Sequence, residues 1–272
     1  MVELSAGLSA AALDAIADLE RRVVAADGGR LKLEWNSLRN RSGEEVEDLL
    51  WWDGERLLGF LGIYSHGAPT LELTGMVDPA ARRRGIGGAL LDAGLKLCRG
   101  RSVLLVVPRT SVAGRALALG RGGRLEHSEH ALQLLGEPAA VAADPAITVR
   151  AATPADWPAL REILRLAFGW EPREPSDRDT FVVERDGRPI GTARLHAEGD
   201  GAGIYGFAIH PDLQGRGIGR DVLSRLCRLA RTGGAKAVNL EVATDNDRAL
   251  HLYTSIGFRP VITEDYYALP EK

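Results

Sequence analysis

Two stretches of twelve residues decide how this chain folds. The first reads VDPAARRRGIGG at residues 77–88, and the second reads IHPDLQGRGIGR at residues 209–220. Gly217 follows Gly85 by 132 positions. Two further landmarks recur in the same order at a spacing of 133 positions: the Asp-Gly turns at 53–54 and 186–187, and the Arg-Ala-Leu triplets at 115–117 and 248–250. Three landmarks in nearly one register indicate a duplicated domain.

The composition is that of an ordinary globular protein. The chain has 272 residues, 45% of them hydrophobic and 26% charged, with a net charge of -3. These values exclude membrane, collagen-like and wholly disordered classes, and they lack the basic footprint of a nucleic-acid-binding protein. The N-terminus has neither the basic nor the apolar region of an export signal, so we expect a cytoplasmic protein. We expect no membrane partner, and either a monomer, in which the two halves form a pseudo-dimer, or a homodimer.

The two halves are expected to be separate domains. The sequence predicts an N-terminal domain at residues 1–137, a linker at 138–146 and a C-terminal domain at 147–272. The linker has small residues, two prolines and little periodicity, which is typical of a connecting segment. Cys98 and Cys227 are the only cysteines, so neither a disulfide framework nor a multi-cysteine zinc site is expected.

Periodicity predicts an α+β fold with a mixed sheet. In the second half we expect the order strand, helix, three strands, helix, strand, helix, strand. The stretch 170–179 is expected to form a loop. In the predicted strand 237–243, Val238 faces the core and Glu241 faces the opposite side. The first half follows the same plan, with an opening helix from about Ser9.

The glycine-rich turn at residues 214–220 is predicted to bind an anion. It joins a strand to a helix, so several backbone amides and the positive end of the helix dipole converge on one point. The dinucleotide fingerprint does not fit, because it needs an acidic residue about twenty positions later and position 239 is Asn239. The Gly-Lys-Ser/Thr of a P-loop is absent as well.

The same turn resembles the Gln/Arg-x-x-Gly-x-Gly/Ala signature of the GNAT superfamily of acetyl-CoA-dependent N-acetyltransferases. Residues 240–246 and 249–258 resemble the Asn-x-x-Ala-x-x-x-Tyr-x-x-x-Gly-Phe ending of that family. The resemblance implies two tandem GNAT domains, each a splayed mixed sheet flanked by helices, with acetyl-CoA as co-substrate and no metal. It implies CoA contacts at Ala208, Ile209, Gln214, Gly215, Arg216, Gly217, Ile218, Gly219, Arg220 and Asn246. A second CoA site is implied in the first half, at Arg82, Arg84, Gly85, Gly87 and Gly88.

Two side chains are candidates for the chemistry. Tyr253 is the natural acid, because a phenol can give its proton to a departing thiolate of comparable basicity. Glu241 is the candidate base, and its spacing to Tyr253 resembles that in the ribosomal-protein alanine N-acetyltransferases. The alternatives are a tyrosine that packs a helix on the sheet and a solvated strand carboxylate. Asn246 is either a helix N-cap, a CoA contact or both.

We therefore expect an acetyl-CoA-dependent N-acetyltransferase. The C-terminal domain would move the acetyl group by direct transfer to a primary amine of a small molecule, or to a protein N-terminus. Cys227 is expected in the core, which argues against a covalent acetyl-enzyme. An acidic rim either favours a cationic amine or is simply solvated; its members are Glu171, Glu174, Glu198 and Asp200.

The first half departs from the pattern where chemistry occurs. At the 133-residue spacing, Pro108, Ala113 and Gly120 stand where Glu241, Asn246 and Tyr253 do in the second half. We expect a non-catalytic domain that either binds CoA or keeps its glycines as a turn. The alternative for the whole chain is a non-catalytic acyl-CoA-binding regulatory module.

The tandem layout resembles that of the mycothiol synthases. Those enzymes carry a glutamate on the fourth strand as base, whereas the matching position here is Gly203. We therefore expect a relative with another amine substrate.

Overall fold

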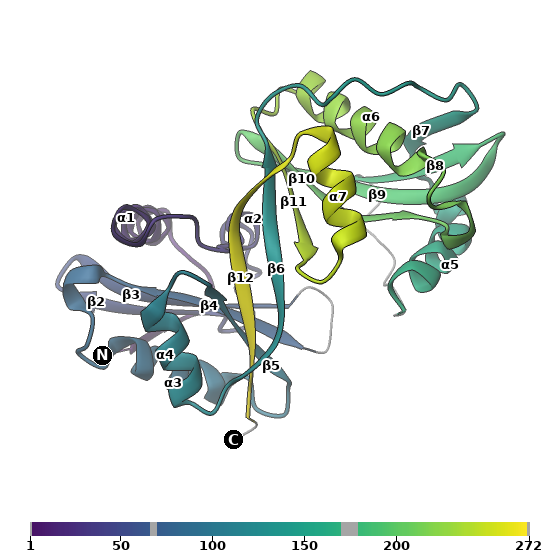
Figure 1. Ribbon diagram of the computed structural model, residues 1–272. Helices are drawn as coiled ribbons and strands as arrows, with labels where there is room; N and C mark the ends of the chain where they lie inside the picture. Colours follow the sequence, from purple (N-terminus) through teal and green to yellow (C-terminus); the bar gives the residue numbers. More distant parts are fainter. Residues whose placement is uncertain (1, 66–69, 170–178, 271–272) are drawn as a thin grey trace. The chain divides into compact units, whose positions relative to one another are not determined.

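The computed structural model describes residues 2–65, 70–169 and 179–270. The chain forms two compact units (Figure 1). Unit 1 comprises residues 1–129 and 261–272, and unit 2 comprises residues 130–260. Each unit combines a mixed β-sheet with helices, which confirms the predicted α+β class.

Unit 1 is built on six strands in the order β1-β2-β3-β4-β5-β12. Only β4 and β5 run parallel to each other, and the other neighbours are antiparallel. The strand bounds are β1 Val2–Ser5, β2 Asp48–Asp53, β3 Arg56–Tyr64, β4 Leu71–Val77, β5 Val103–Pro108 and β12 Arg259–Leu269. The helices are α1 Ala10–Asp27, α2 Trp35–Arg39, α3 Ile86–Leu97 and α4 Val112–Gly120.

Two hydrophobic cores fill unit 1, one on each face of the sheet. Ile16 of α1 and Leu38 of α2 pack with Phe60 on one face. Leu90 of α3 and Ala118 of α4 pack with residues of β4 and β5 on the other. Strand β3 is buried along nearly its whole length because both faces are covered.

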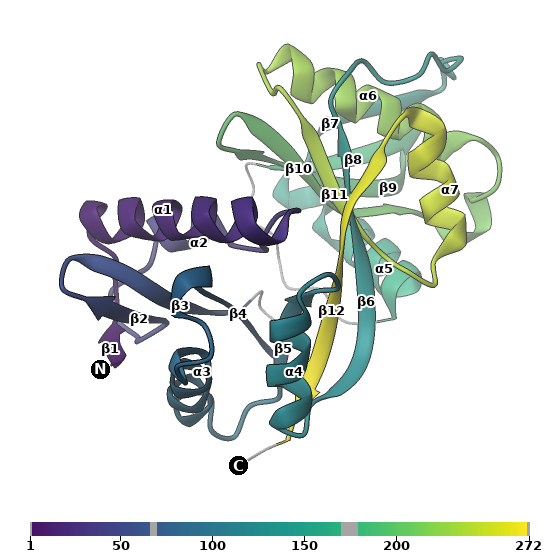
Figure 2. The same ribbon diagram turned by 60° about the vertical axis from the view of Figure 1, so that its left-hand side comes forward.

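Unit 2 repeats this plan with the strand order β6-β11-β10-β9-β8-β7. Helices α6 and α7 pack on one face of this sheet, and α5 packs against β9 and β10. In Figure 2, α5 lies on the side of the sheet away from α6. The bounds are β6 Arg124–Leu134, β7 Ile147–Ala151, α5 Trp157–Phe168, β8 Thr180–Arg185, β9 Arg188–Glu198, β10 Gly201–Ile209, α6 Ile218–Thr232, β11 Val238–Ala243 and α7 Asp247–Ile256.

Capping residues mark the ends of three of the helices. Ser9 caps α1 and accepts a hydrogen bond from the amide of Ala12. Thr153 and Asp156 form a capping box before α5. Gly257 ends α7 in the left-handed conformation, with φ of 114°. The helix expected from about Ser9 is confirmed, whereas the loop expected at 170–179 falls almost wholly outside the described residues.

The last strand of each sequence half reaches the compact unit of the other half: β6 does so from His130 onward and β12 from Val261 onward. Strand β12 pairs with β5 of unit 1 from Glu264 opposite Pro108 to Leu269 opposite Val103. Leu132, at the end of β6, is part of the unit 2 core. The compact units therefore differ from the repeats, whose predicted boundaries at 137 and 147 describe the duplication. None of the helices in the described ranges has the length and apolar character of a membrane span.

We predict that Tyr266→Ala unfolds or loosens unit 1. Its ring is 1% exposed, and its hydroxyl accepts a hydrogen bond from Lys32 at 2.6 Å and donates one to Glu129 at 2.7 Å. Removal of a buried aromatic ring costs about 3–5 kcal/mol. Denaturant unfolding should show this loss, and hydrogen exchange should accelerate in β5.

Val261→Ala on the same strand is the control, because that side chain is 45% exposed. It should cost less than about 0.5 kcal/mol. Equal exchange in β5 of both variants would contradict the assignment of β12 to unit 1.

Candidate functional site

In unit 2 two parallel strands pair briefly and then separate. Strands β10 and β11 are in register at Ala202 with Val238 and at Gly203 with Asn239. Beyond this pair, β10 continues to Ile209 and β11 continues to Ala243. In the described residues, no register pair joins β10 to β11 beyond Gly203. Ala208 and Ile209 lie on this stretch of β10, and their contact with CoA stays a prediction.

A bulge reshapes β10 just beyond this point. The pairing of β10 with β9 shifts register between Tyr205 and Ala208. Gly206 lies inside the bulge with φ of 55°. A bulge re-aims backbone groups and is over-represented next to active sites. The sequence analysis missed it, although an isolated glycine inside a strand is its usual signal.

The glycine-rich turn of unit 2 has the geometry of an anion site. Gly215 and Gly217 adopt left-handed conformations with φ of 78° and 82°, and Gly217 is the N-cap of α6. The Gln214 side chain donates a hydrogen bond to the carbonyl of Ile209 at 2.9 Å, which ties the turn to the end of β10. The amides of Arg220 and Asp221 donate to the carbonyl of Gly217 at 3.1 and 3.2 Å. The amides that precede them lie at the N-terminus of α6, the end of a helix that favours an anion.

Unit 1 keeps a similar turn. Gly85 caps α3 with φ of 83°, and Arg83 takes the left-handed position that Gly215 occupies in unit 2. Arg82 donates to the carbonyl of Val77 at 3.2 Å, which is the contact that Gln214 makes in unit 2.

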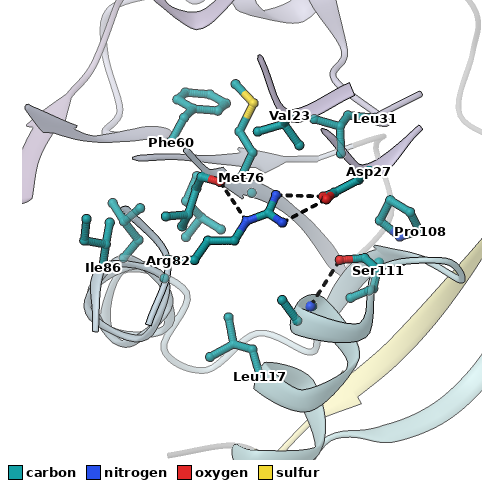
Figure 3. A pocket seen from close by; sticks show the side chains of 18 of the residues that line it. Val23, Asp27, Leu31, Phe60, Met76, Arg82, Ile86, Pro108, Ser111 and Leu117 are labelled. Atoms are coloured by element: carbon teal, nitrogen blue, oxygen red, sulfur yellow. Dashed lines mark hydrogen bonds and ion pairs between the residues drawn. The ribbon is translucent and has the colours of Figure 1, made fainter. Parts of the chain in front are cut away.

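A cavity of about 290 Å³ lies beside this turn in unit 1 (Figure 3). Its lining joins the separating strands β4 and β5 to α1, to the start of α3 and to the glycines at 85, 87 and 88. Most of its lining is apolar, including Val23, Phe60 and Leu117. Figure 3 shows the Arg82 guanidinium in the cavity, where it pairs with Asp27 at 2.8 and 2.7 Å.

Tyr253 lies on α7 in the core of unit 2 with 8% of its surface exposed. Its ring meets Phe258 edge-on at 6.2 Å between centroids. Burial raises the pKa of Tyr253 to about 12. The phenol is therefore fully protonated at neutral pH, as a proton donor must be. The packing role and the catalytic role weighed for this residue are compatible.

Strand β11 alternates as predicted, with Leu240 buried and Glu241 half-buried on the opposite face. Asn239 shares the face of Glu241 and accepts a hydrogen bond from Gln133 of β6 at 3.0 Å. Asn246 is the N-cap of α7, and its side chain accepts a hydrogen bond from the amide of Ala249 at 3.0 Å. The capping role of Asn246 is thereby confirmed, and its contact with CoA stays a prediction.

Two further polar pairs lie on the face that carries Glu241. Tyr205 donates a hydrogen bond to Glu198, and His196 Nδ1 lies 2.6 Å from Asp179. The sequence analysis included Glu198 in an acidic rim but missed its partner and the His196 pair. Of the other rim residues, Asp200 pairs with Lys236 at 3.3 Å, while Glu171 and Glu174 lie outside the described residues.

The helix caps correct the alignment of the two halves. Asn246 caps α7 and Ser111 caps α4, so the spacing here is 135 positions and not 133. The spacing grows from 132 at the first residues of α3 and α6 to 135 at their last residues, because α6 has 15 residues and α3 has 12. The unit 1 counterparts of Glu241 and Tyr253 are therefore Val106 and Ala118. Neither side chain can act as an acid or a base. The first half is therefore still expected to be non-catalytic.

Cysteine and metal chemistry have little support in the described part of the chain. Cys98 and Cys227 are both buried, with 2% and 0% exposed. Burial raises the pKa of both thiols, that of Cys227 to about 12. Within residues 2–65, 70–169 and 179–270, no group of three or more His, Cys, Asp or Glu side chains is placed to hold a metal ion.

Comparisons with known proteins agree with this geometry. The model of the acetyltransferase (GNAT) family matches the chain twice, at residues 13–118 and at residues 148–258. A mycothiol acetyltransferase of Clavibacter sepedonicus is 33% identical over 235 residues, which are 75% of this chain and 75% of that protein. A mycothiol acetyltransferase of Rhodococcus opacus is 29% identical over 284 residues, 91% of each chain.

Solved structures share the fold at low identity. A GCN5-related N-acetyltransferase from Sphaerobacter thermophilus has a TM-score of 0.82 at 19% identity, and the match covers 100% of this chain and 97% of that one. A tandem GNAT protein from the clavulanic acid biosynthesis pathway has a TM-score of 0.70 at 18% identity, covering 100% and 99%. The tandem fold expected from the sequence is confirmed.

We predict that neither cysteine reacts with a thiol reagent in the folded protein at pH 8. The thiolate is the reactive form, and burial disfavours it at both positions. Intact-mass measurement should show no alkylation of the native chain and two alkylations in denaturant. Rapid labelling of Cys227 in the native protein would contradict this prediction and favour a mechanism with an acetyl-enzyme intermediate on that thiol.

Proposed function

The chain belongs to the acetyltransferase (GNAT) family and is an N-acetyltransferase, and we propose that unit 2 transfers the acetyl group of acetyl-CoA directly to a primary amine. The acceptor in this proposal is a small molecule, with a protein N-terminus as the second option. The supporting observation is that the separated strands, the anion-binding turn and a buried protonated tyrosine all belong to unit 2. Unit 1 lacks the tyrosine.

The proposed binding of acetyl-CoA uses backbone groups more than side chains. The amides of residues 215–219 and the guanidinium groups of Arg216 and Arg220 would face the pyrophosphate. The open edge of β10 at Ala208 and Ile209 would pair with the amides of the pantetheine arm. Asn246 would reach the arm from the start of α7.

The proposed chemistry needs a neutral amine, a polarised thioester and a proton for the leaving thiolate. The amine nitrogen forms a bond to the acetyl carbon, and the carbon–sulfur bond then breaks. Glu241 takes the proton that the nitrogen loses as the tetrahedral intermediate collapses. Tyr253 gives its proton to the sulfur and is reprotonated through solvent.

A small amine is favoured because the curated relatives reported above are mycothiol acetyltransferases. Gly203 stands where the mycothiol synthases carry the glutamate that acts as general base, so we propose a different amine from theirs. An assay that follows thiol release from acetyl-CoA across a panel of amines tests the function. The panel should include desacetylmycothiol, amino sugars, polyamines and short peptides. Acetyl-CoA binding without turnover on any amine would instead favour a regulatory module.

We predict that Tyr253→Phe lowers kcat about 100-fold with little change in the KM for acetyl-CoA, because general acid catalysis contributes at least that much. The wild-type rate should not decline through loss of this proton up to about pH 10, since the pKa of Tyr253 is raised to about 12. Tyr267→Phe is the matched control, a tyrosine in the core of unit 1 that is 4% exposed. An unchanged rate in Tyr253→Phe would remove this residue from the mechanism.

Gly217→Ala and Gly85→Ala form a matched pair that separates the two turns. Each glycine has φ near 80° and no atom within 4 Å of the added Cβ, so the substitution strains only the backbone. The strain is about 1–2 kcal/mol. We expect Gly217→Ala to raise the KM for acetyl-CoA about tenfold, and Gly85→Ala to leave turnover unchanged.

Calorimetric titration of the same variants tests whether unit 1 also binds CoA. We propose that its cavity is a second, non-catalytic site, so the wild type should bind two molecules of acetyl-CoA. Gly85→Ala should weaken only one of these sites. A single site that is lost in Gly217→Ala and kept in Gly85→Ala would mean that the glycines of unit 1 serve only as a turn.

A further inference from the structure

A carboxylate from a neighbouring strand lies over the point where β10 and β11 separate. Gly203 is the last residue of β10 in register with β11. A Cβ built on Gly203 would overlap the carboxylate of Glu198, whose Cδ would lie 2.9 Å away. Glu198 is on β9, the strand on the other side of β10. The Cε2 atom of Tyr205 would lie 2.5 Å from the same Cβ. The missing side chain of Gly203 therefore makes room for both the carboxylate of Glu198 and the ring of Tyr205.

The carboxylate of Glu198 is held in this place. The Tyr205 hydroxyl donates a hydrogen bond to Oε1 of Glu198. The Tyr205 ring is in turn covered by the guanidinium of Arg194, 5.9 Å from its centroid. Glu198 is half-buried, so a ligand can reach it. One oxygen is thus oriented by a phenol, which leaves the other to face an incoming group.

Strand pairing shows which side chains share the face of Glu198. His196 is the partner of Gly203 and Arg194 is the partner of Tyr205, so both project to this side of β9. Asn239, the β11 partner of Gly203, projects to the same side, and Glu241 follows it two residues later. In the described ranges, the charged or titratable groups that strands β9, β10 and β11 place on this face next to Glu198 are Arg194, His196 with Asp179, Tyr205 and Glu241.

We propose that Glu198 binds the ammonium form of the acceptor and takes its first proton. This inference rests on the proposed function of unit 2 and adds a residue to the same site. The two carboxylates Glu198 and Glu241 then stand on opposite sides of the opening between the strands, one carried by β9 and the other by β11. Such a pair favours a cationic acceptor over a neutral or anionic one.

Two carboxylates match the number of protons that the nitrogen must lose. A primary ammonium gives one proton to Glu198 and becomes a nucleophile. After attack on the thioester carbon, the nitrogen gives a second proton to Glu241, the carbon–sulfur bond breaks, and Tyr253 protonates the sulfur. The protons on Glu198 and Glu241 leave to solvent, and Tyr253 takes one proton back from solvent. The balance is one amide, one thiol and one released proton for each ammonium and thioester consumed.

The test compares acceptors and pH values with the isosteric variant Glu198→Gln. For an alkyl amine of pKa about 10, kcat/KM at pH 7 should fall about 100-fold. At pH 10 the loss should shrink to less than about fivefold, because half of the amine is then already neutral. For an acceptor with a peptide-type amine of pKa about 8, the loss at pH 7 should be smaller than for the alkyl amine.

Three further variants isolate the role of Glu198. Glu241→Gln should lose activity equally at both pH values, because the second proton leaves only after attack. His196→Asn, on the same face of β9, should stay within about threefold of the wild type. The double variant Glu198→Ala with Gly203→Glu moves the carboxylate to β10 and should recover much of the activity lost in Glu198→Ala alone.

The double variant is sterically feasible, because the φ of Gly203 lies outside the left-handed region and the Tyr205 ring beside it is 36% exposed and can turn. Circular dichroism and thermal melting check that each variant folds. Unchanged kcat/KM in Glu198→Gln, or an equal loss at pH 7 and pH 10, would overturn the role of Glu198 and leave the proposed function standing. A wild type that acetylates no amine would remove the proposed function and this inference with it.

Discussion

The functional site depends on two parallel strands that hold each other at only two positions. Strands β10 and β11 pair at Ala202 and Gly203 and then part. Unpaired backbone donors and acceptors are costly when they are buried without water or a ligand. A gap of this kind persists only if packing on both sides of it is firm. Helix α6 supplies such packing, since its Val222 and Leu226 belong to the same buried core as Ile209 of β10 and Leu240 of β11.

The outer edge of β11 is fixed by a strand from the other sequence half. Gln133 of β6 bonds to Asn239, and Leu132 and Leu134 extend the core of unit 2. Strand β12 does the same for unit 1, where Asp265 accepts hydrogen bonds from Arg109 at 2.7 Å and from Ser128 at 2.8 Å. Each separated pair of strands therefore relies on a segment of the other repeat. A duplicated chain with this exchange cannot be cut into two independent halves without exposing a sheet edge in each.

The sequence could predict those features that local chemistry determines. The cap at Ser9, the capping box at Thr153, the alternation along β11 and the left-handed glycines all follow from residue types at fixed spacing. The sequence could not predict that β6 and β12 extend into the unit of the other half. The alternation of apolar and polar residues in a strand is the same whichever sheet the strand joins. The spacing of 133 also misaligned α4 with α7, since an insertion inside a helix leaves no turn signal to count from.

The position of Glu198 shows why a site is harder to predict than a fold. From the sequence alone, Gly203 is a position where the glutamate of the mycothiol synthases is absent. Glu198 is a charged residue near a turn, for which solvation is a sufficient explanation. Only the pairing of β9 with β10 brings the two together, through contacts between residues that lie on different strands. A glycine in a strand interior is expensive in conformational entropy. At position 203 the space of the missing side chain is filled by the Glu198 carboxylate and the Tyr205 ring.

The two units differ more in their reacting groups than in their binding surfaces. Arg82 and Gln214 make the same contact with the preceding strand, and the charge of Arg82 is matched by Asp27. Arg84 matches Arg216, and the left-handed Gly85 matches Gly217. Arg83 instead takes the place of Gly215, and Gly88 takes that of Arg220. What unit 1 has lost is the tyrosine, the β11-type carboxylate and the bulge, since β4 pairs with β3 in unbroken register from Val77 to Glu72. Unit 1 thus keeps a glycine-rich turn beside a mostly apolar cavity, without counterparts of Glu241 and Tyr253.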